Sequence, residues 1–355
     1  MLLALLVIVL PVALAAGAYL LLERDDPTGS TPAAARPAER PAEGGDGSSG
    51  TDSVKVGAGG EASPDTSGSR MMLPPDAGTQ AALPPEAGDP SPLVDAEPTP
   101  QVPLVGADAF TLRLKKPPRA ALVFDMDTGK VLWRLRPLKT LPMASLTKIM
   151  TALVVTEETR PREPVRITKA ALDYSGSGIG VLPRGKRVRL ETLLNGMLIV
   201  SGNDAAIALA VHVAGNERRF VRLMNEHALR WGLRCTRFSD SHGLGAGDRS
   251  CPRDLAVMAR LAMDRPRIAR IVRRQQASFK FPIKGRKVYF AGHNPLIRSG
   301  YRGALGLKTG YTDAAGRCFV GVARRGGRTL AVVLLNSPNP ETQAPKLLDR
   351  GFASL

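Results

Sequence analysis

Ser145 and Lys148, a serine and a lysine three residues apart, are the first side chains whose types and spacing suggest chemistry. Apolar residues at helical spacing surround them and follow Pro142, so the pair is predicted to lie at the start of a helix. Positions i and i+3 share a helix face, and the amine can then reach the hydroxyl. A neutral amine, its pKa lowered by burial or by a second cation, is a general base for a serine nucleophile. A helix N-terminus also offers a free backbone N–H beside the reacting carbon.

Ser201 and Asn203 form a second polar pair, on either side of Gly202, in a predicted turn between two helices. The hydroxyl can relay a proton to a leaving amine, and the amide can orient Lys148 and a substrate amide. The same three-residue pattern recurs at 337–339, in a predicted loop, so by itself it specifies little.

Lys308, Thr309 and Gly310 form the third element, on a predicted strand. The lysine supplies a positive field that favours a neutral Lys148. The threonine hydroxyl can bind a substrate carboxylate, and the glycine leaves room for a substrate lying along the strand. Each element alone is also compatible with a structural role, such as a helix cap beside a solvated lysine. Their occurrence together, in this order on a helix start, a turn and a strand, indicates serine acyl-transfer chemistry.

The elements that must position these groups lie between residues 119 and 352. Strands are predicted at both ends of this region, with helices between them and one at the end of the chain. This order predicts one α+β domain in which the terminal strands share a sheet covered by helices. The predicted strands are 119–125, 131–135, 305–310, 318–323 and 329–335, and the predicted helices are 145–158, 190–200, 204–213, 220–231, 254–263 and 341–351.

Longer stretches around the three motifs resemble the low-molecular-mass penicillin-binding proteins, the serine D-alanyl-D-alanine carboxypeptidases of peptidoglycan maturation. One departure is Gly202, where the related pattern has an aspartate. The resemblance implies an α+β fold of the β-lactamase and penicillin-binding type, with an antiparallel sheet covered by helices and a helical subdomain. Many family members also have a C-terminal β-domain, but none is expected here, because the chain stops at Leu355, just past the last predicted helix. The resemblance covers about 119–352. The stretches that carry it are 143–153, 200–206, 306–312, 315–316, 127–132 and 242–244.

This resemblance implies that Ser145 attacks the D-Ala–D-Ala peptide carbonyl while Lys148 accepts its proton. An acyl-enzyme would form with loss of D-alanine, and water would release the shortened peptide. The backbone N–H groups of Ser145 and Tyr311 would form the oxyanion hole. β-Lactams would acylate the same serine, and neither a metal nor an organic cofactor is expected. The implied catalytic residues are Ser145, Lys148, Ser201 and Asn203, and the implied substrate-binding residues are Lys308, Thr309, Gly310 and Tyr311.

One departure from the family pattern leaves the preferred substrate of the reaction open. The family commonly carries an arginine between the last strand and the C-terminal helix, where it binds the substrate carboxylate. Residues 336–345 contain no basic side chain, so Thr309, Lys308 or another arginine must take that role. Endopeptidase action on cross-links remains an alternative. A β-lactamase is disfavoured, because Glu217 and Glu226, between the second and third motifs, lack the E-x-x-L-N context of a class A deacylating base.

The cysteines and histidines indicate no metal site. Three cysteines are too few for a disulfide framework, and neither a C-x-x-C nor an H-E-x-x-H motif occurs. Cys235 and Cys251 are 16 residues apart. They either form a disulfide in an oxidising compartment, which leaves Cys318 as a single thiol, or remain buried thiols. The four histidines are interpreted as structural, although His242 and His293 fall in loops that can border the cleft.

The N-terminal part of the chain predicts the compartment. Residues 1–22 carry no charge and are long enough to span a bilayer. They predict an uncleaved anchor or a cleaved signal segment, and both place the remaining chain outside the cytoplasm, in the cell envelope. Residues 23–108 hold 14 Pro and 12 Gly without any Phe, Trp or Tyr, which predicts a disordered acidic linker. Residues 109–355 form the predicted catalytic domain.

The charge of the chain follows the same division. Of 49 basic and 32 acidic side chains, 44 and 17 fall in 109–355, which gives this region a net charge of +27. Such a region favours an anionic partner. Scattered basic residues, few aromatics and export disfavour nucleic acid. The expected partners are peptidoglycan stem peptides, β-lactams as inhibitors, an anionic wall polymer, and the membrane through residues 1–22.

Overall fold

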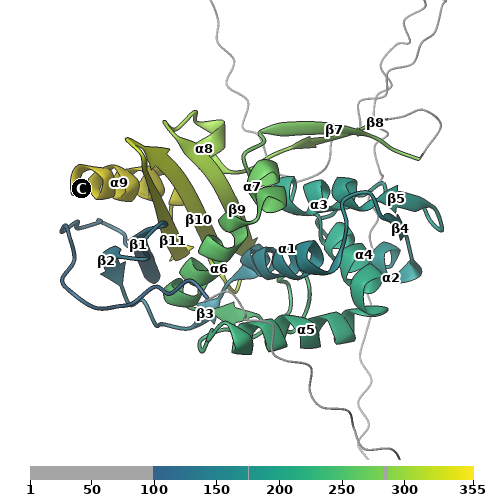
Figure 1. The fold of residues 1–355 in the computed structure, drawn as a ribbon, viewed down its shortest axis with the longest axis horizontal. Coiled ribbons are helices and arrows are strands. Elements are labelled where there is room, and N and C mark those ends of the chain that lie inside the picture. Colours follow the sequence, from purple (N-terminus) through teal and green to yellow (C-terminus); the bar gives the residue numbers. More distant parts are fainter. Residues whose placement is uncertain (1–98, 175, 283–286) are drawn as a thin grey trace, which may run out of the picture. The chain divides into compact units, whose positions relative to one another are not determined.

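A five-stranded antiparallel sheet forms the centre of the fold in the computed structural model, which describes residues 99–174, 176–282 and 287–355 (Figure 1). Its strand order is β2-β1-β11-β10-β9. The first strand pairs with the last, from Ala120 opposite Leu335 to Asp125 opposite Leu330, so the terminal strands share a sheet as predicted. The strands are β1 (Ala120–Asp125), β2 (Val131–Leu135), β9 (Ala304–Thr312), β10 (Gly316–Arg325) and β11 (Arg328–Ser337).

Helices cover both faces of the sheet, because its central strands are apolar on both sides. All six residues of β1 are buried. On one face α9 (Pro340–Ala353) packs against β11, and Leu347 and Leu348 lie in one cluster with Val332. On the other face α6 (Pro252–Asp264) contacts β1 and β11, and α1 (Thr147–Glu158) packs against α6.

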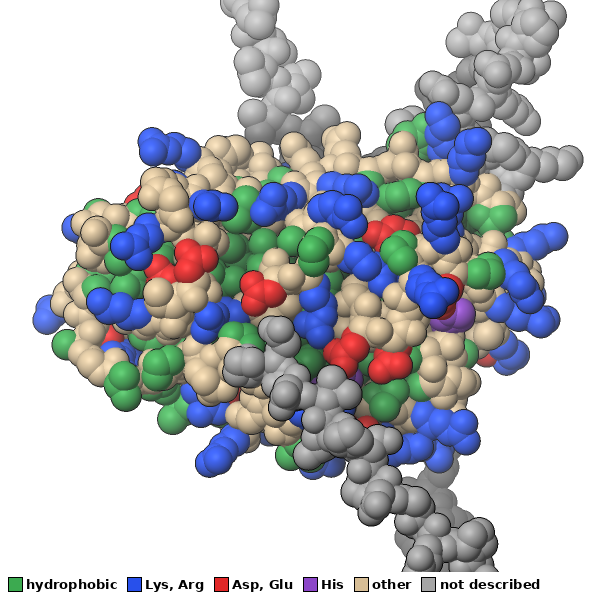
Figure 2. Space-filling model, viewed as in Figure 1, with side chains coloured by type: hydrophobic (Ala, Val, Ile, Leu, Met, Phe, Trp, Pro, Cys, Tyr) green, Lys and Arg blue, Asp and Glu red, His purple; other side chains and the backbone are tan. Residues whose placement is uncertain are grey.

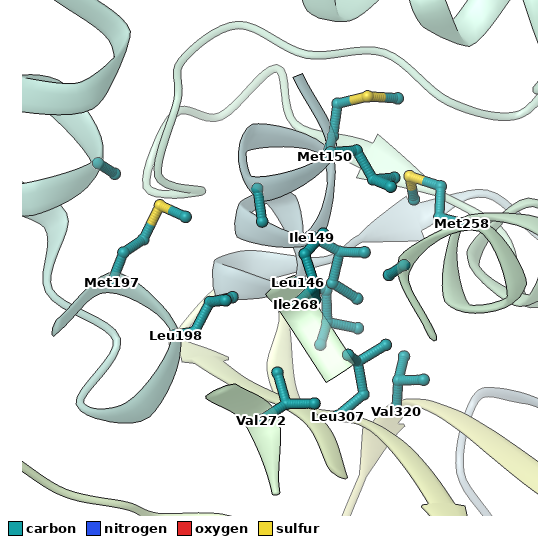
Figure 3. Packing of buried hydrophobic residues seen from close by; sticks show 14 of the residues in the cluster. Leu146, Ile149, Met150, Met197, Leu198, Met258, Ile268, Val272, Leu307 and Val320 are labelled. Carbon is teal, nitrogen blue, oxygen red and sulfur yellow. The ribbon is translucent and has the colours of Figure 1, made fainter. Parts of the chain in front are cut away.

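An apolar cluster joins the start of α1 to the sheet (Figure 3). Burying one side chain of this size stabilises the fold by about 1.5–3 kcal/mol. The cluster therefore holds the turn that carries Ser145 against the strand that carries Lys308. Its members include Leu146, Ile149, Met150, Met258, Ile268, Val272, Leu307 and Val320, with Ile268 and Val272 from α7 (Pro266–Val272).

A helical region beside the sheet completes the α+β fold. Within it α1 contacts α3, α4 and α5. The longer helices are α3 (Leu190–Ile199), α4 (Asn203–Ala214) and α5 (Glu217–Arg230). The shorter elements are the 3-10 turn η1 (Ala144–Leu146), α2 (Lys169–Leu172), α8 (Pro295–Arg298) and the strand pairs β3 (Leu141–Pro142) with β6 (Arg249–Ser250), β4 (Pro164–Arg166) with β5 (Arg187–Arg189), and β7 (Gln276–Lys280) with β8 (Lys287–Ala291).

Every strand and helix that the sequence predicted is present, with ends that differ by at most three residues. One placement needs correction. Ser145 lies in η1, the 3-10 turn before α1, and not in the α-helix itself. The short strand pairs and α2, α7 and α8 were not predicted, because they are too brief to show a clear period in the sequence.

The packed region begins ahead of residue 109. Val102 is buried, and Asp108 forms an ion pair with Arg134 of β2 at 2.6 Å. The predicted anchor 1–22 and most of the predicted linker fall on residues 1–98, which lie outside the described residues. Among the residues that the structure describes, none of the helices has the length and apolar character needed to cross a membrane.

Candidate active site

Ser145 is held by close backbone contacts on two sides. The preceding residue, Ala144, has a φ of 50°. A Cβ on Gly243 would lie 2.0 Å from the carbonyl oxygen of Ala144, and a Cβ on Gly310 would lie 3.0 Å from the backbone nitrogen of Ser145. The glycine of the third motif is therefore what allows β9 to approach the serine.

The amine of Lys148 lies within hydrogen-bonding distance of three oxygens. Its Nζ is 2.8 Å from Ser145 Oγ and 2.6 Å from the carbonyl oxygen of His242, and it also contacts Oδ1 of Asn203. The side chain is fully buried. Burial, and then the charge of Lys308, hold the pKa of Lys148 well below its usual value. The structure thus combines the proximity and the environment that a lysine base requires.

Ser201 and Lys308 form a second hydrogen-bonded pair. Lys308 Nζ donates to Ser201 Oγ at 2.9 Å and to the carbonyl oxygen of Thr309 at 2.8 Å. Lys308 is also buried, which lowers its pKa to about 7. The structure therefore brings together Ser145, Lys148, Ser201, Asn203, Lys308 and Gly310, from three separate segments of the chain.

The structure offers a reason for Gly202 in place of an aspartate. A Cβ at this position would lie 3.1 Å from both Asp204 Oδ1 and Ile179 Cγ1. An aspartate would therefore crowd Ile179 and place a second carboxylate beside Asp204.

Sequence reasoning missed the residues that hold the Asn203 turn. Asn203 Nδ2 donates to the hydroxyl of Tyr174 at 2.7 Å, and the ring of Tyr174 lies 5.3 Å from that of His242. Asp204 accepts from the backbone N–H of Ile179 at 2.7 Å and of Gly180 at 2.9 Å. Asp204 directly follows the motif and could have been found from it. Tyr174 has no sequence signal, because it reaches the site from a loop 29 residues away.

The loop 239–248 presents the His242 carbonyl to Lys148, and two carboxylates shape it, the partly buried Asp240 and the buried Asp248. Asp240 accepts four successive backbone N–H groups, from residues 242 to 245. Asp248 accepts from the hydroxyl of Thr147 at 2.7 Å and from the backbone and hydroxyl of Ser239. The loop is thereby tied to α1 next to Lys148.

A disulfide between Cys235 and Cys251 closes this loop, so the paired alternative of the sequence interpretation is confirmed. Cys318 is a free, buried thiol. His242 reaches the site through its backbone carbonyl. His293 lines a small cavity together with Thr309.

The side chain of Tyr311 does not join the hydrogen-bonded site. It is 62% exposed, and its hydroxyl donates to Asp313 at 2.9 Å. Thr309 is half-buried two residues earlier on β9, so both side chains are directed to the same face of the strand. That face is the place to look for groups that bind substrate.

An arginine from another element reaches the segment in which the sequence lacks one. Arg317 on β10 is the cross-strand partner of Tyr311, and its Nη1 lies 3.3 Å from the carbonyl oxygen of Pro338. Its side chain is 55% exposed and lies 3.9 Å from Glu341. Arg317 is therefore close to residues 336–345 and beside the end of the third motif.

Two groups of side chains that can bind metals occur in the described part of the chain, and neither includes a residue of the three motifs. One contains Cys235 and Cys251, whose sulfurs are bonded to each other. The other contains Glu157, Glu158 and His227, and Arg265 already pairs with Glu157 at 2.9 Å.

Comparisons with known proteins agree with this geometry. The family model described as D-alanyl-D-alanine carboxypeptidase, peptidase S11, matches residues 114–339. The D-alanyl-D-alanine carboxypeptidase DacF of Bacillus subtilis is 32% identical over 252 residues, which are 68% of this chain and 64% of that protein. DacB2 of Mycobacterium tuberculosis is 34% identical over 268 residues, which are 73% of this chain and 87% of that protein.

Solved structures show the same similarity. A crystal structure of a D-alanyl-D-alanine carboxypeptidase from Mycobacterium tuberculosis superposes with a TM-score of 0.63 at 33% identity, covering 73% of this chain and 96% of that one. A mutant of a Streptomyces DD-transpeptidase gives a TM-score of 0.63 at 31% identity, covering 68% of this chain and all of that one. The fold, the family model and the relatives agree, and this chain belongs to the D-alanyl-D-alanine carboxypeptidase family of serine peptidases.

Proposed function

We propose that this protein removes the terminal D-alanine from peptidoglycan stem pentapeptides through an acyl-enzyme on Ser145. The observation that carries the proposal is the buried amine of Lys148, 2.8 Å from Ser145 Oγ, with a pKa held well below its usual value. A serine becomes a nucleophile when a neighbouring base takes its proton. Both partners are present at hydrogen-bonding distance, with the amine buried and the serine partly exposed to an incoming substrate.

The three oxygens around Lys148 fit its neutral form. A neutral amine has two N–H groups, which donate to Asn203 Oδ1 and to the carbonyl oxygen of His242. Its lone pair is then directed to Ser145, whose hydroxyl donates to Nζ. As Oγ forms its bond to the D-Ala carbonyl carbon, the hydroxyl proton passes to Lys148.

The leaving group needs a proton, and Ser201 is the group we assign to deliver it. When the tetrahedral intermediate collapses, the C–N bond breaks and the nitrogen of D-alanine takes a proton through the Ser201 hydroxyl, with Lys148 as its source. Lys308 donates to Ser201 Oγ and orients it. We assign the oxyanion hole to the backbone N–H groups of Ser145 and Tyr311. Water then attacks the acyl carbon and gives its proton to Lys148. The ester bond to Ser145 Oγ breaks, Oγ takes a proton back from Lys148, and the shortened peptide leaves.

We propose that Arg317 and Thr309 bind the terminal carboxylate of the substrate. Arg317 is the cross-strand neighbour of Tyr311, and Thr309 lies diagonally from it on the same face of the sheet. Its exposed guanidinium donates from Nη1 to the carbonyl oxygen of Pro338 and meets Glu341 only at 3.9 Å, which leaves its Nε and Nη2 donors available. A guanidinium matches a carboxylate with two parallel hydrogen bonds. Arg317 would then fill the role that no basic side chain in 336–345 can take.

The measurement that tests the function is D-alanine release from a soluble pentapeptide ending in D-Ala–D-Ala. We expect release by the wild-type chain, and none by Ser145→Ala, which retains the fold but has no nucleophile. A labelled β-lactam should acylate the wild type and leave the variant unlabelled. D-alanine release that persists in Ser145→Ala would exclude the proposed mechanism.

Endopeptidase action on cross-linked peptides is the second candidate. One relative, a D-alanyl-D-alanine endopeptidase of Haemophilus influenzae, is 33% identical over 221 residues. The two reactions share the acyl-enzyme and differ in the amine that leaves. Cleavage of a purified cross-linked muropeptide dimer, compared with the pentapeptide at equal concentration, distinguishes them.

We propose that the protein works outside the cytoplasm, where its substrate and a stable disulfide are both found. Residues 1–22 would supply the membrane anchor, or the signal if they are cleaved. The net charge of +27 in 109–355 would favour contact with anionic wall polymer. Mass spectrometry of the protein from membranes of the producing cell would show whether the segment is retained.

A further inference from the structure

A strongly basic segment runs along the helical region, from residue 160 to residue 189. It contains eight lysines and arginines and only two carboxylates. Both carboxylates already have partners, Glu163 with His212 at 3.0 Å and Asp173 with Lys169 at 2.6 Å. The other seven basic side chains are exposed, and none forms an ion pair with the residues that the structure describes: Arg160, Arg162, Arg166, Arg184, Lys186, Arg187 and Arg189.

The two-stranded sheet of β4 and β5 displays three of these arginines. Its inward side chains, Val165 and Val188, are buried, whereas Arg166, Arg187 and Arg189 are exposed. Arg166 is the direct cross-strand partner of Arg187. Like charges directly opposite each other destabilise a sheet. Such an arrangement is therefore better suited to a bound anion than to the stability of the free protein.

The strands also fix the spacing of the charges. Alternate residues on one face of a strand lie about 6–7 Å apart, so Arg187 and Arg189 form a short row. Backbone hydrogen bonds beyond the strands continue the pairing, from Ile167 N to Lys186 O at 2.9 Å and from Gly185 N to Ile167 O at 3.0 Å. Figure 2 shows lysine and arginine side chains projecting from the end of the molecule where β4 and β5 lie. A linear polyanion can follow such a row.

The surface lacks the features of a membrane or nucleic-acid site. Membrane-surface elements insert apolar or aromatic side chains, and single-stranded nucleic acid stacks on aromatics. None of the exposed large apolar side chains of the described residues belongs to 160–189; they are Val105, Leu138, Leu229, Leu244, Tyr289, Tyr311 and Leu355. Charge without apolar anchors fits a hydrated polymer of phosphate groups.

The same segment leads to the active site. Between α2 and β5 the chain passes Tyr174, which binds Asn203, and Gly180, which binds Asp204. Arg187 lies seven residues after Gly180, a reach of no more than about 25 Å for an extended chain. A polymer bound along β5 would therefore pass within about 25 Å of Gly180, which contacts Asp204 next to the second motif.

We propose that the β4–β5 sheet with its flanking basic residues is a docking surface for a polyanionic phosphodiester polymer of the cell wall. The polymer would hold the enzyme against the wall in which its substrate is embedded. Binding is driven by release of the counterions of the polymer, so it weakens with salt. The surface is separate from the catalytic residues, and its occupation does not require turnover.

The test uses the full-length chain and fluorescently labelled poly(glycerol phosphate), titrated at several salt concentrations. The variant R166Q/R187Q/R189Q removes the three arginines of the sheet. The matched control, R302Q/R324Q/R350Q, removes three exposed arginines around β9, β10 and α9, at the other end of the described region (Figure 1). Both variants change the net charge by the same amount, so a difference between them reports location and not total charge.

We expect the sheet variant to bind the polymer at least about tenfold more weakly than wild type. The slope of log K against log salt should fall by about 2, because each phosphate contact of a flexible polyanion contributes about 0.7 to that slope. The control should stay within about twofold of wild type. The proposal would be overturned if both variants bound the polymer equally weakly, or if neither bound it more weakly than wild type. So would a sheet variant that binds phosphatidylglycerol vesicles less well but retains polymer binding. D-alanine release from the soluble pentapeptide should be unchanged in the sheet variant, which separates this proposal from the proposed function.

Discussion

At the scale of single residues, the site depends on buried charges whose environments differ. Lys148 and Lys308 are both buried lysines with lowered pKa values. Asp248 is shifted in the opposite sense, because burial and then the charge of Asp240 raise its pKa from 3.8 to about 6. A carboxyl group that binds Thr147, next to Lys148, thus becomes a source of pH dependence.

Asp248→Asn should change stability in a pH-dependent way. The folded protein favours the protonated carboxyl, so wild-type stability falls as the pH rises from about 4 to about 6 and then levels off. The amide cannot ionise, and above pH 6 the variant should be more stable by up to about 3 kcal/mol. Below about pH 4 the two should be nearly equal. Urea unfolding at pH 4 and pH 8 checks this. A variant less stable than wild type at pH 8 would mean that the hydrogen bonds from Thr147 and Ser239 to the carboxylate outweigh its burial.

Arg317→Ala should weaken the recognition of substrate and leave the nucleophile intact. Loss of a guanidinium–carboxylate pair costs about 1.5–3 kcal/mol, which corresponds to about 10- to 150-fold in kcat/KM. Steady-state D-alanine release measures this, with Arg324→Ala, another exposed arginine of β10, as the control. The assignment would be supported if wild type and Arg317→Ala cleaved a substrate with an amidated terminal carboxylate at the same rate. The assignment would be contradicted if Arg317→Ala kept the wild-type kcat/KM for the substrate with a free terminal carboxylate.

At the scale of elements, the three motifs could be recognised in the sequence, whereas the backbone groups and short strands around them could not. Ser145, Lys148, Ser201, Asn203 and the strand tripeptide have side chains with recognisable spacing. The third acceptor of Lys148 is a backbone carbonyl, that of His242, which any residue type could supply. The long strands and helices were predicted because their apolar residues repeat with a clear period. The β4 and β5 strands were missed because each has one buried residue between two exposed ones.

Gly310→Ala should test how closely β9 must approach η1. The added Cβ would lie 3.0 Å from Ser145 N and 3.1 Å from the carbonyl oxygen of Met143. Backbone atoms cannot move aside as a flexible side chain can, so β9 should shift away from the serine. A displacement of about 1 Å can lower activity by about 100-fold.

The matched control is Gly351→Ala on α9, where the added Cβ would lie 3.0 Å from the end of the Leu330 side chain. Its rate of acylation by a labelled β-lactam should equal that of wild type. If Gly310→Ala were also acylated at the wild-type rate, the close approach of β9 to Ser145 would not be needed for acylation.

At the scale of the whole molecule, the disulfide makes the stability of the fold depend on redox conditions. It closes the chain around the loop 239–248, whose His242 carbonyl accepts a hydrogen bond from Lys148. A crosslink closing a loop of about 16 residues stabilises a protein by about 3 kcal/mol. Reduced protein should therefore be both less stable and less active.

C235S/C251S should unfold at a lower urea concentration and release D-alanine more slowly than wild type. Cys318→Ala, which removes the free thiol, is the control for the loss of a buried sulfur and should keep its response to reducing agent. If C235S/C251S kept the wild-type kcat, Asp240 and Asp248 would be sufficient to shape the loop.

The position of β9 at the end of the sheet order has one more consequence. An edge strand offers unpaired N–H and C=O groups, and a peptide can pair with them as an additional strand. Main-chain pairing of this kind fixes the direction in which each Cα substituent points. Mirror-image residues would direct their methyl groups to opposite sides, and on one side Ser145 and Gly310 are in close contact. We expect the enzyme to distinguish its substrates by handedness at the scissile bond far more than by side-chain size further along the peptide.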